Sequence, residues 1–171
     1  ESLKRKTNGN WEYTLFPGRA DGDQLTGILW NTNRLIAVSA AGTPWNAQSD
    51  KPWPLPISRA RSSTGNMLWS RPPHAMKFTT GNKRSDFIIV PVHMKADYQG
   101  KFDKHRAEEA RALAATLPKV SELFKDSDII VIGDTNITDE HEVTIDILTD
   151  FGLADLNKAH EPTHWQGGGM D

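Results

Sequence analysis

Two apolar runs of this sequence end in side chains that can hold or transfer a proton. The run "IIVPVH" ends at His93, and the run "IIVIGD" ends at Asp134, with Asn136 two residues later. Strand ends are places where a rigid scaffold presents side chains to a cleft, so these two sites can converge. An Asp can hold or deprotonate a water molecule, and an Asn can donate a hydrogen bond to an oxyanion or ligate a hard metal. Gly133 would let the backbone turn sharply and approach a ligand closely.

Each of these residues also has a purely structural interpretation. A Gly-Asp-Xaa-Asn sequence after a strand is a common turn, in which Asp and Asn bond their own backbone. A single His at a strand end is more often structural than catalytic. Arg71 in "WSRPPH" can bind phosphate through its planar guanidinium group, although a loop arginine is usually solvated. Taken one at a time, these residues leave both interpretations open.

Other catalytic patterns are weak or missing from the sequence. His160 and His164 in "HEPTH" have a spacing that occurs in zinc sites, but Pro162 argues against a helix with both imidazoles on one face. The sequence has no Gly-Xaa-Ser-Xaa-Gly elbow and no phosphate-binding Gly-rich loop. It also has no cysteine, which excludes disulfides, thiolate nucleophiles and Cys-ligated metals.

The composition is that of an ordinary globular protein. The 171 residues include 37% hydrophobic and 25% charged residues, with a net charge of −2. We therefore expect a single domain over residues 1–171. The charge does not indicate a nucleic-acid binder, and no apolar run approaches the roughly 20 residues of a membrane span. Because the first residue is Glu1 rather than Met, we interpret the start as processed or trimmed.

The elements that must position these residues follow from apolar periodicity and turn signals. Strands are predicted at 11–16 and 25–30, and a hairpin is predicted from 74–80 and 86–94. Helical spacing predicts helices over 104–117 and 119–125, and another helix starting near Asp139. The run 128–134 is expected to be a buried strand, and 152–156 a further short strand. Strands and helices that mix without strict alternation favour an α/β sandwich with helices covering sheets.

The segment 39–73 has no convincing periodicity. It holds Trp45, Trp53 and Trp69 together with six of the ten prolines. A loop of this length inside a compact domain is usually functional or mobile, and its tryptophans indicate that part of it packs. Trp45 or Trp53 could contact a base or a lipid headgroup, although core packing is at least as good an explanation for each.

In order along the chain, several motifs resemble the endonuclease/exonuclease/phosphatase superfamily, which has the deoxyribonuclease I-like fold. They are "GILWNTNRL", "WSRPPHAMKF", "FIIVPVHMKA", "VIGDTN" and "PTHWQGGGMD", and they extend from about residue 11 to the end. "VHMK" is similar to the family's His-Leu-Lys strand. "GDTN" is similar to its Gly-Asp-Phe-Asn, with Thr135 in place of the usual aromatic residue. The resemblance implies a four-layer sandwich of two packed β-sheets flanked by helices.

The resemblance also implies site residues and a cofactor. Asp134 would position or activate the attacking water, Asn136 would bind the phosphoryl group, and His93 would contact the phosphate and relay a proton. Arg71 matches a phosphate-contacting arginine, and Asp171 matches the aspartate that orients a catalytic histidine. The implied cofactor is Mg²⁺, or else Mn²⁺ or Ca²⁺.

The sequence departs from the family pattern at both ends. The family has an Asn and a metal-binding Glu on strands before the region where this chain starts, and a Ser-Asp-His beyond Asp171. We therefore expect the domain to be incomplete at both ends. The metal ligands stay unknown, with Asp134 as one possible ligand.

The function expected from the resemblance is metal-dependent hydrolysis of a phosphate ester, with phosphodiester bonds in nucleic acid as the first choice of substrate. Inositol phosphates or phospholipids are the alternative substrates, because the family uses the same centre on different leaving groups. A non-catalytic binding module that has kept the fold is the alternative of another class. No protein partner is evident from the sequence.

Overall fold

The structure, a computed structural model, describes residues 9–18, 24–46, 50–80, 85–96, 102–137 and 141–156. The elements in chain order are β1 (Trp11–Leu15), β2 (Gly27–Asn31), β3 (Ile36–Val38), β4 (Trp53–Pro54), the 3₁₀ turn η1 (Pro56–Arg59), β5 (His74–Thr79), β6 (Asp86–His93), α2 (Asp103–Ala114), α3 (Leu117–Phe124), β7 (Ile129–Asp134) and α4 (Val143–Asp150). Within these ranges, no helix has the length and apolar character needed to cross a membrane.

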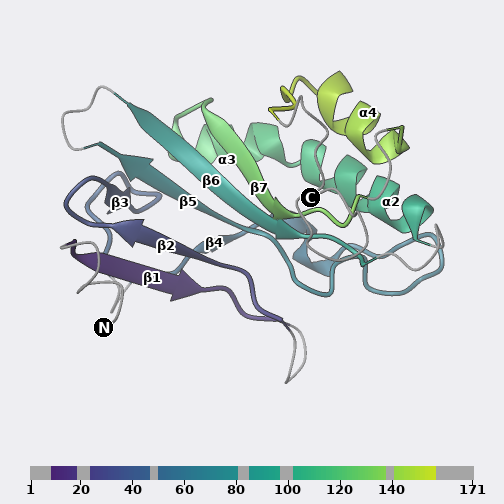
Figure 1. The fold of residues 1–171 in the computed structure, drawn as a ribbon, viewed down its shortest axis with the longest axis horizontal. Coiled ribbons are helices and arrows are strands. Elements are labelled where there is room, and N and C mark those ends of the chain that lie inside the picture. Colours follow the sequence, from purple (N-terminus) through teal and green to yellow (C-terminus); the bar gives the residue numbers. More distant parts are fainter. Residues whose placement is uncertain are drawn as a thin grey trace.

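Two sheets form the scaffold (Figure 1). β1 and β2 make an antiparallel pair, and the second, five-stranded sheet has the order β3-β5-β6-β7, with β4 also pairing with β5. The hairpin expected from 74–80 and 86–94 is confirmed as the antiparallel pair of β5 and β6. β6 and β7 run parallel, with His93 opposite Asp134 in the register. Their carboxyl ends therefore lie at the same edge of the sheet.

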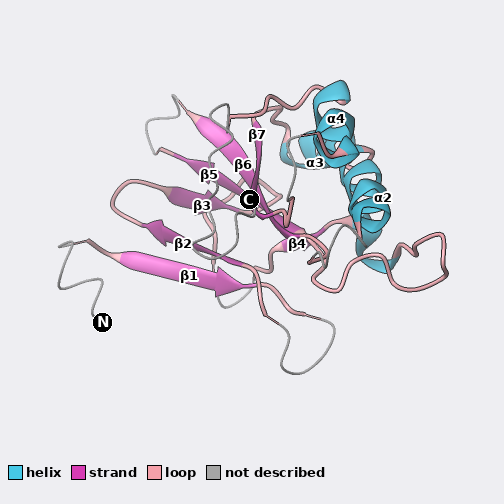
Figure 2. Cartoon of the chain, turned by 45° about the vertical axis from the view of Figure 1, so that its right-hand side comes forward, coloured by secondary structure: helices cyan, strands magenta, loops and turns pink. Residues whose placement is uncertain are grey.

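One face of the larger sheet packs against the helices, which lie together on one side of the molecule (Figure 2). On β6, the buried residues Ile88, Val90 and Val92 recur with the period of two expected for a strand. They share a core with Ala110 and Leu113 of α2, at the helical spacing seen in the sequence. The burial of this stripe holds α2 against the strand that carries His93.

The opposite face of the larger sheet packs against the β1–β2 pair. Met76 and Phe78 of β5 join Ile28 and Trp30 of β2 and the nearby Phe16 in a second core. The expected architecture of two packed sheets with helices is thereby confirmed. Among the described residues, helices cover one outer side of this sandwich, whereas the outer side of the β1–β2 pair exposes 71% of Tyr13 and 54% of Leu29.

Three details of the predicted elements were wrong. The helix expected from near Asp139 begins at Val143, and residues 152–156 form no strand. The strand 128–134 was expected to be buried, but 41% of Ile130 and 58% of Ile132 are exposed. β7 lies at the edge of its sheet, and no described residue of the β1–β2 core packs over these two side chains. A continuous apolar run therefore did not mean that both faces are covered.

The segment 39–73 packs in part, as its tryptophans indicated. Trp69 is fully buried in the core shared with the helices. Trp53 meets Phe124 edge to face, with ring centroids 6.5 Å apart, and Trp45 packs against the core between the two sheets. These contacts explain Trp45 and Trp53 as packing residues without a base or lipid ligand.

Candidate active site

The carboxyl end of β7 requires glycine at position 133. Gly133 has a φ of +141°, which side-chain-bearing residues rarely adopt, and a Cβ built there would lie 2.1 Å from the Val92 carbonyl oxygen. Glycine thus permits the close approach of β7 to β6. The apolar run of β7 ends at Gly133, and the strand register places the next residue, Asp134, opposite His93.

His93 and Asp134 form a pair across the two parallel strands. His93 Nε2 lies 3.4 Å from Asp134 Oδ2, and the exposed fractions of the two side chains are 13% and 42%. The imidazole is thus largely enclosed, while the carboxylate reaches solvent. The expected convergence of the two strand ends occurs, although the catalytic roles of both residues stay predictions.

The Asp134–Asn136 segment is a turn as well as part of this cluster. The backbone N–H of Asn136 donates to Asp134 Oδ1 at 3.0 Å, the Asx bond expected of a Gly-Asp-Xaa-Asn turn. Asn136 has a φ of +53°, a conformation that Asn tolerates better than most residues. The carboxylate divides its oxygens, because Oδ1 holds the turn and Oδ2 faces His93. The structural interpretation of this motif is therefore correct and compatible with a catalytic one.

Arg71 and Asn136 meet at one backbone oxygen. Asn136 Nδ2 donates to the Met94 carbonyl at 3.1 Å, and Arg71 Nη2 approaches the same oxygen at 3.4 Å. Arg71 Nε is buried and has no hydrogen-bond partner in the described part of the chain. A buried donor without a partner costs about 1–3 kcal/mol, and this cost would fall if an anion accepted the bond. Arg71 therefore brings to the cluster one N–H donor that no described residue uses.

A group of charged residues that the sequence did not reveal binds the backbone of Lys95, close to this cluster. The Lys95 backbone N–H donates to Glu109 Oε2 at 2.8 Å, and Arg106 Nη1 donates to the Lys95 carbonyl at 3.2 Å. Arg106 also binds both oxygens of Glu142 at 2.7 Å. One feature of the sequence could have identified Arg106 and Glu109. They lie next to Ala107 and Ala110, on the apolar stripe of the helix.

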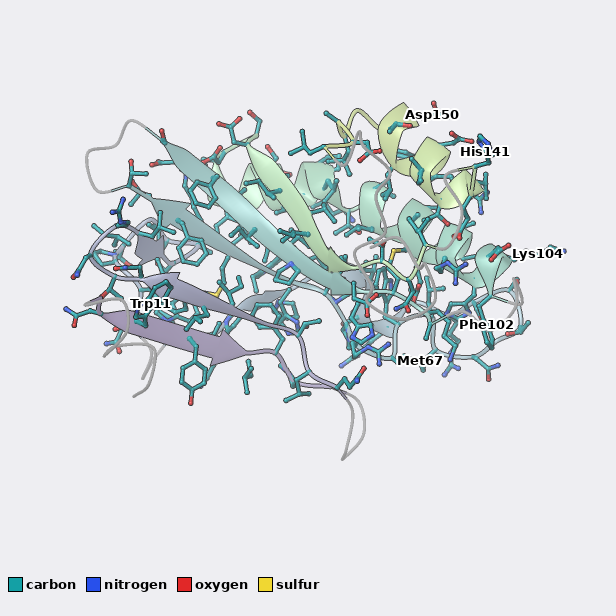
Figure 3. The ribbon with its side chains drawn as sticks, in the orientation of Figure 1. Trp11, Met67, Phe102, Lys104, His141 and Asp150 are labelled. Carbon is teal, nitrogen blue, oxygen red and sulfur yellow. The ribbon has the colours of Figure 1, made fainter. Side chains whose placement is uncertain are left out.

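Glu109 is the most perturbed acid of this group. Burial raises its pKa from 4.5 to about 8, while the Lys95 amide and the charges of Arg71, Arg106 and Lys95 pull the pKa down. The carboxyl is therefore largely protonated at neutral pH. The side chain of Lys95 is also held, since its Nζ lies 4.8 Å from the ring centre of Phe102. Phe102 lies at the start of α2 (Figure 3).

A complete metal site is not formed by the described residues. Among them, no group of three or more His, Asp or Glu side chains is arranged to hold a metal ion. Mg²⁺ is usually bound through one or two carboxylates together with waters and substrate phosphates. Asp134 supplies one such carboxylate at the strand ends. Asp171, His160 and His164 lie outside the described residues, so the expected contribution of Asp171 and the disfavoured zinc site stay untested.

One cavity in the described part of the chain differs in character from this polar cluster. It has a volume of about 460 Å³ and runs beside β7, where Ile130, Ile132, Ile145, Leu148 and Leu153 contribute to its lining. None of His93, Asp134, Asn136 or Arg71 is part of this lining. The cavity is mainly apolar, which does not suit a phosphate group.

The fold is shared with known structures, although no protein-family model and no curated protein matches this sequence. The human Nocturnin catalytic domain with bound sulfate anion matches with a TM-score of 0.58 and 17% identity, over 85% of this chain and 48% of that one. An endonuclease/exonuclease/phosphatase family protein from Bacteroides thetaiotaomicron matches with a TM-score of 0.50 and 18% identity, over 87% of this chain and 48% of that one. The chain thus spans about half the length of these structures, and the likeness shows the fold.

Proposed function

We propose that this chain, which has the fold of the endonuclease/exonuclease/phosphatase superfamily, is the part of a phosphoesterase that carries its phosphate-binding and water-activating residues. The reaction is hydrolysis of phosphodiester bonds by attack of water on phosphorus, with nucleic acid as the first choice of substrate. Phosphate esters hydrolyse extremely slowly without a catalyst, so such a site must align a water molecule and offset negative charge.

The observation that carries this proposal is the meeting of four side chains from separate segments at one edge of the sheet. His93 ends β6, Asp134 ends β7, Asn136 follows in the turn, and Arg71 comes from the loop before β5. A turn alone would explain Asp134 and Asn136. It would not explain why Arg71, whose buried Nε has no hydrogen-bond partner among the described residues, lies against the same backbone oxygen.

Each side chain has a role that its geometry permits. Asp134 Oδ2 accepts a hydrogen bond from the attacking water, and the adjacent His93 accepts or relays the proton that the water loses. The second N–H of the Asn136 amide and the Nε–H of Arg71 donate to phosphate oxygens as negative charge develops. The sulfate bound in the human Nocturnin structure is a tetrahedral anion, like a phosphate group.

A requirement for a divalent cation is part of the proposal and rests on the resemblance. The described residues supply Asp134 as one possible ligand and do not complete the site. The further ligands would come from residues outside the described ranges or from the rest of a longer protein.

The experiment that tests the proposal is magnesium-dependent hydrolysis of bis(4-nitrophenyl) phosphate and of single-stranded and double-stranded DNA by the full-length gene product. We expect Asp134→Ala to lose about 10²–10⁴-fold in kcat. Asp128→Ala is the matched control, because Asp128 is an exposed carboxylate immediately before β7 and should leave the rate unchanged.

Two results would contradict the proposal. Equal activity of the Asp134→Ala variant and the wild type would exclude Asp134 from the chemistry. Absence of hydrolysis in the wild type, with inositol phosphates and phospholipids also tried, would favour a non-catalytic binding module.

A further inference from the structure

The short backbone segment Met94–Lys95 connects every member of the candidate site. Its Met94 N–H donates to the Asp134 carbonyl at 2.9 Å. Its Met94 carbonyl accepts from Asn136 and Arg71. The segment also follows His93 directly in the chain. A displacement of these two residues would therefore move the phosphate-binding groups and the His93–Asp134 pair together.

Helix α2 holds this segment through two charged side chains. Glu109 accepts the Lys95 N–H at 2.8 Å, and Arg106 donates to the Lys95 carbonyl at 3.2 Å. Both side chains are almost fully buried, with 2% of Glu109 and 0% of Arg106 exposed. Arg106 is neutralised in turn by Glu142 and Asp103, at 2.7 and 2.6 Å.

The position of Glu109 is unusual for a residue that only has to fill space. It lies on the buried side of α2, together with Ala107 and Ala110. A buried carboxyl is costly there unless a hydrogen bond compensates for its burial. Among the described residues, the carboxyl of Glu109 accepts a hydrogen bond from the Lys95 N–H. His105 Nε2 lies 3.7 Å from Glu109 Oε1 but only 2.7 Å from the Leu68 carbonyl oxygen.

We propose that Glu109 is a positioning residue, which holds the Met94–Lys95 segment in register behind the candidate site. The expected effect on catalysis rests on the proposed function. The fixing of Lys95 stands on the geometry alone.

The charged groups around Glu109 decide how its ionisation would act. Arg106 and His105 face it from α2, Arg71 from the loop before β5, and Lys95 from the segment after β6. Burial raises the pKa of Glu109 to about 8, so below this pH the carboxyl is neutral and the charge of Arg71 is available to a phosphate. Above it, the carboxylate offsets Arg71, and substrate binding should weaken.

The kinetic test compares Glu109→Gln and Glu109→Ala in the full-length protein, with kcat and KM measured from pH 6 to pH 10. Glutamine keeps an oxygen that can accept the Lys95 N–H, and it cannot ionise. We expect Glu109→Gln to keep kcat within about twofold but to lose the rise in KM that the wild type shows above pH 8. Glu109→Ala should lose about tenfold or more in kcat at every pH, which is the size of one lost hydrogen bond to the segment. Glu122→Gln, which changes an exposed acid on the next helix, α3, is the control and should follow the wild type.

A second measurement separates this inference from the proposed function. The hydrogen-exchange protection of the Lys95 amide is measured by NMR in the wild type and both variants, without substrate. Protection that is kept in Glu109→Gln and lost in Glu109→Ala supports the positioning role even if the protein hydrolyses nothing. Equal protection in all three proteins overturns it. If the wild type is active, an identical pH dependence of KM in the wild type and Glu109→Gln contradicts the expected effect of the Glu109 charge on substrate binding.

Discussion

At the scale of single residues, Asp134, Asn136 and Arg71 of the candidate site already serve the fold and are proposed also to bind the substrate. Asp134 uses Oδ1 in its own turn and turns Oδ2 towards His93. Asn136 uses one amide N–H on the Met94 carbonyl. Arg71 uses Nη2 on the same oxygen and leaves Nε without a partner among the described residues. Such double use fixes the geometry before a substrate arrives, which is the preorganisation that phosphate-ester hydrolysis needs.

The prediction at this scale concerns Arg71. Arg71→Lys keeps the positive charge but removes Nε and the planar fork. We expect kcat/KM for a phosphodiester to fall about 10–100-fold, because about 1.4–2.8 kcal/mol of charge-assisted hydrogen bonding is lost. Steady-state kinetics on the full-length protein measures this loss. Arg59→Lys is the control, since Arg59 is exposed in the same long segment, and an equally active Arg71→Lys protein would show that Arg71 does not bind the substrate.

At the scale of elements, the parallel pairing of β6 with β7 brings the residues of the candidate site together. Both strands end at the same edge, and the register puts His93 opposite Asp134. Helix α2 then secures the segment after β6 through Glu109 and Arg106. The close approach of the two strands depends on Gly133, where a Cβ would lie 2.1 Å from the Val92 carbonyl oxygen.

The prediction at this scale is that Gly133→Ala both destabilises the fold and separates the pair. We expect a loss of about 2–4 kcal/mol in the free energy of unfolding, from the unfavourable φ and the forced separation of the strands. Urea denaturation measures this loss. Gly152→Ala is the matched control, because Gly152 also has a positive φ, of +96°, but open space around its Cβ position, so its cost should stay near 1 kcal/mol. Equal costs at the two positions would show that the approach of β7 to β6 is not limiting.

At the scale of the whole molecule, the larger sheet has a different neighbour on each face. The helices bury one face, and the β1–β2 pair buries the other over β5 and part of β6. His93 and Asp134 emerge at the sheet edge beyond these cores, so the packing that stabilises the scaffold does not depend on the groups proposed to do chemistry. This separation leads to a prediction about metal removal.

We expect EDTA to abolish phosphodiesterase activity of the full-length protein while its thermal midpoint changes by no more than about 2 °C, because apolar packing holds the described cores together. Added Mg²⁺ should restore the activity, and Mn²⁺ or Ca²⁺ serves to compare cations. Activity and the circular-dichroism melting curve, recorded on the same samples, provide the test. Full activity in EDTA would contradict the requirement for a divalent cation.

Local patterns in the sequence were enough to identify the strand ends at His93 and Asp134, the glycine between strand and turn, and the apolar stripe of α2. Each of these signals depends on residues only a few positions apart, and period and turn chemistry act over that range. They were not enough for β7, because an apolar run has the same appearance whether one or both of its faces are covered.

Only the tertiary structure decided which distant residues meet. Arg71 and Asn136 share the Met94 carbonyl, and Glu109 reaches Lys95 across fourteen positions of sequence. Strand register and helix packing create these contacts, and both depend on the burial of whole faces rather than on neighbouring residues. For this reason the sequence alone does not distinguish Glu109 from a solvated glutamate on a helix surface. In the structure Glu109 is buried and accepts the Lys95 N–H next to the candidate site.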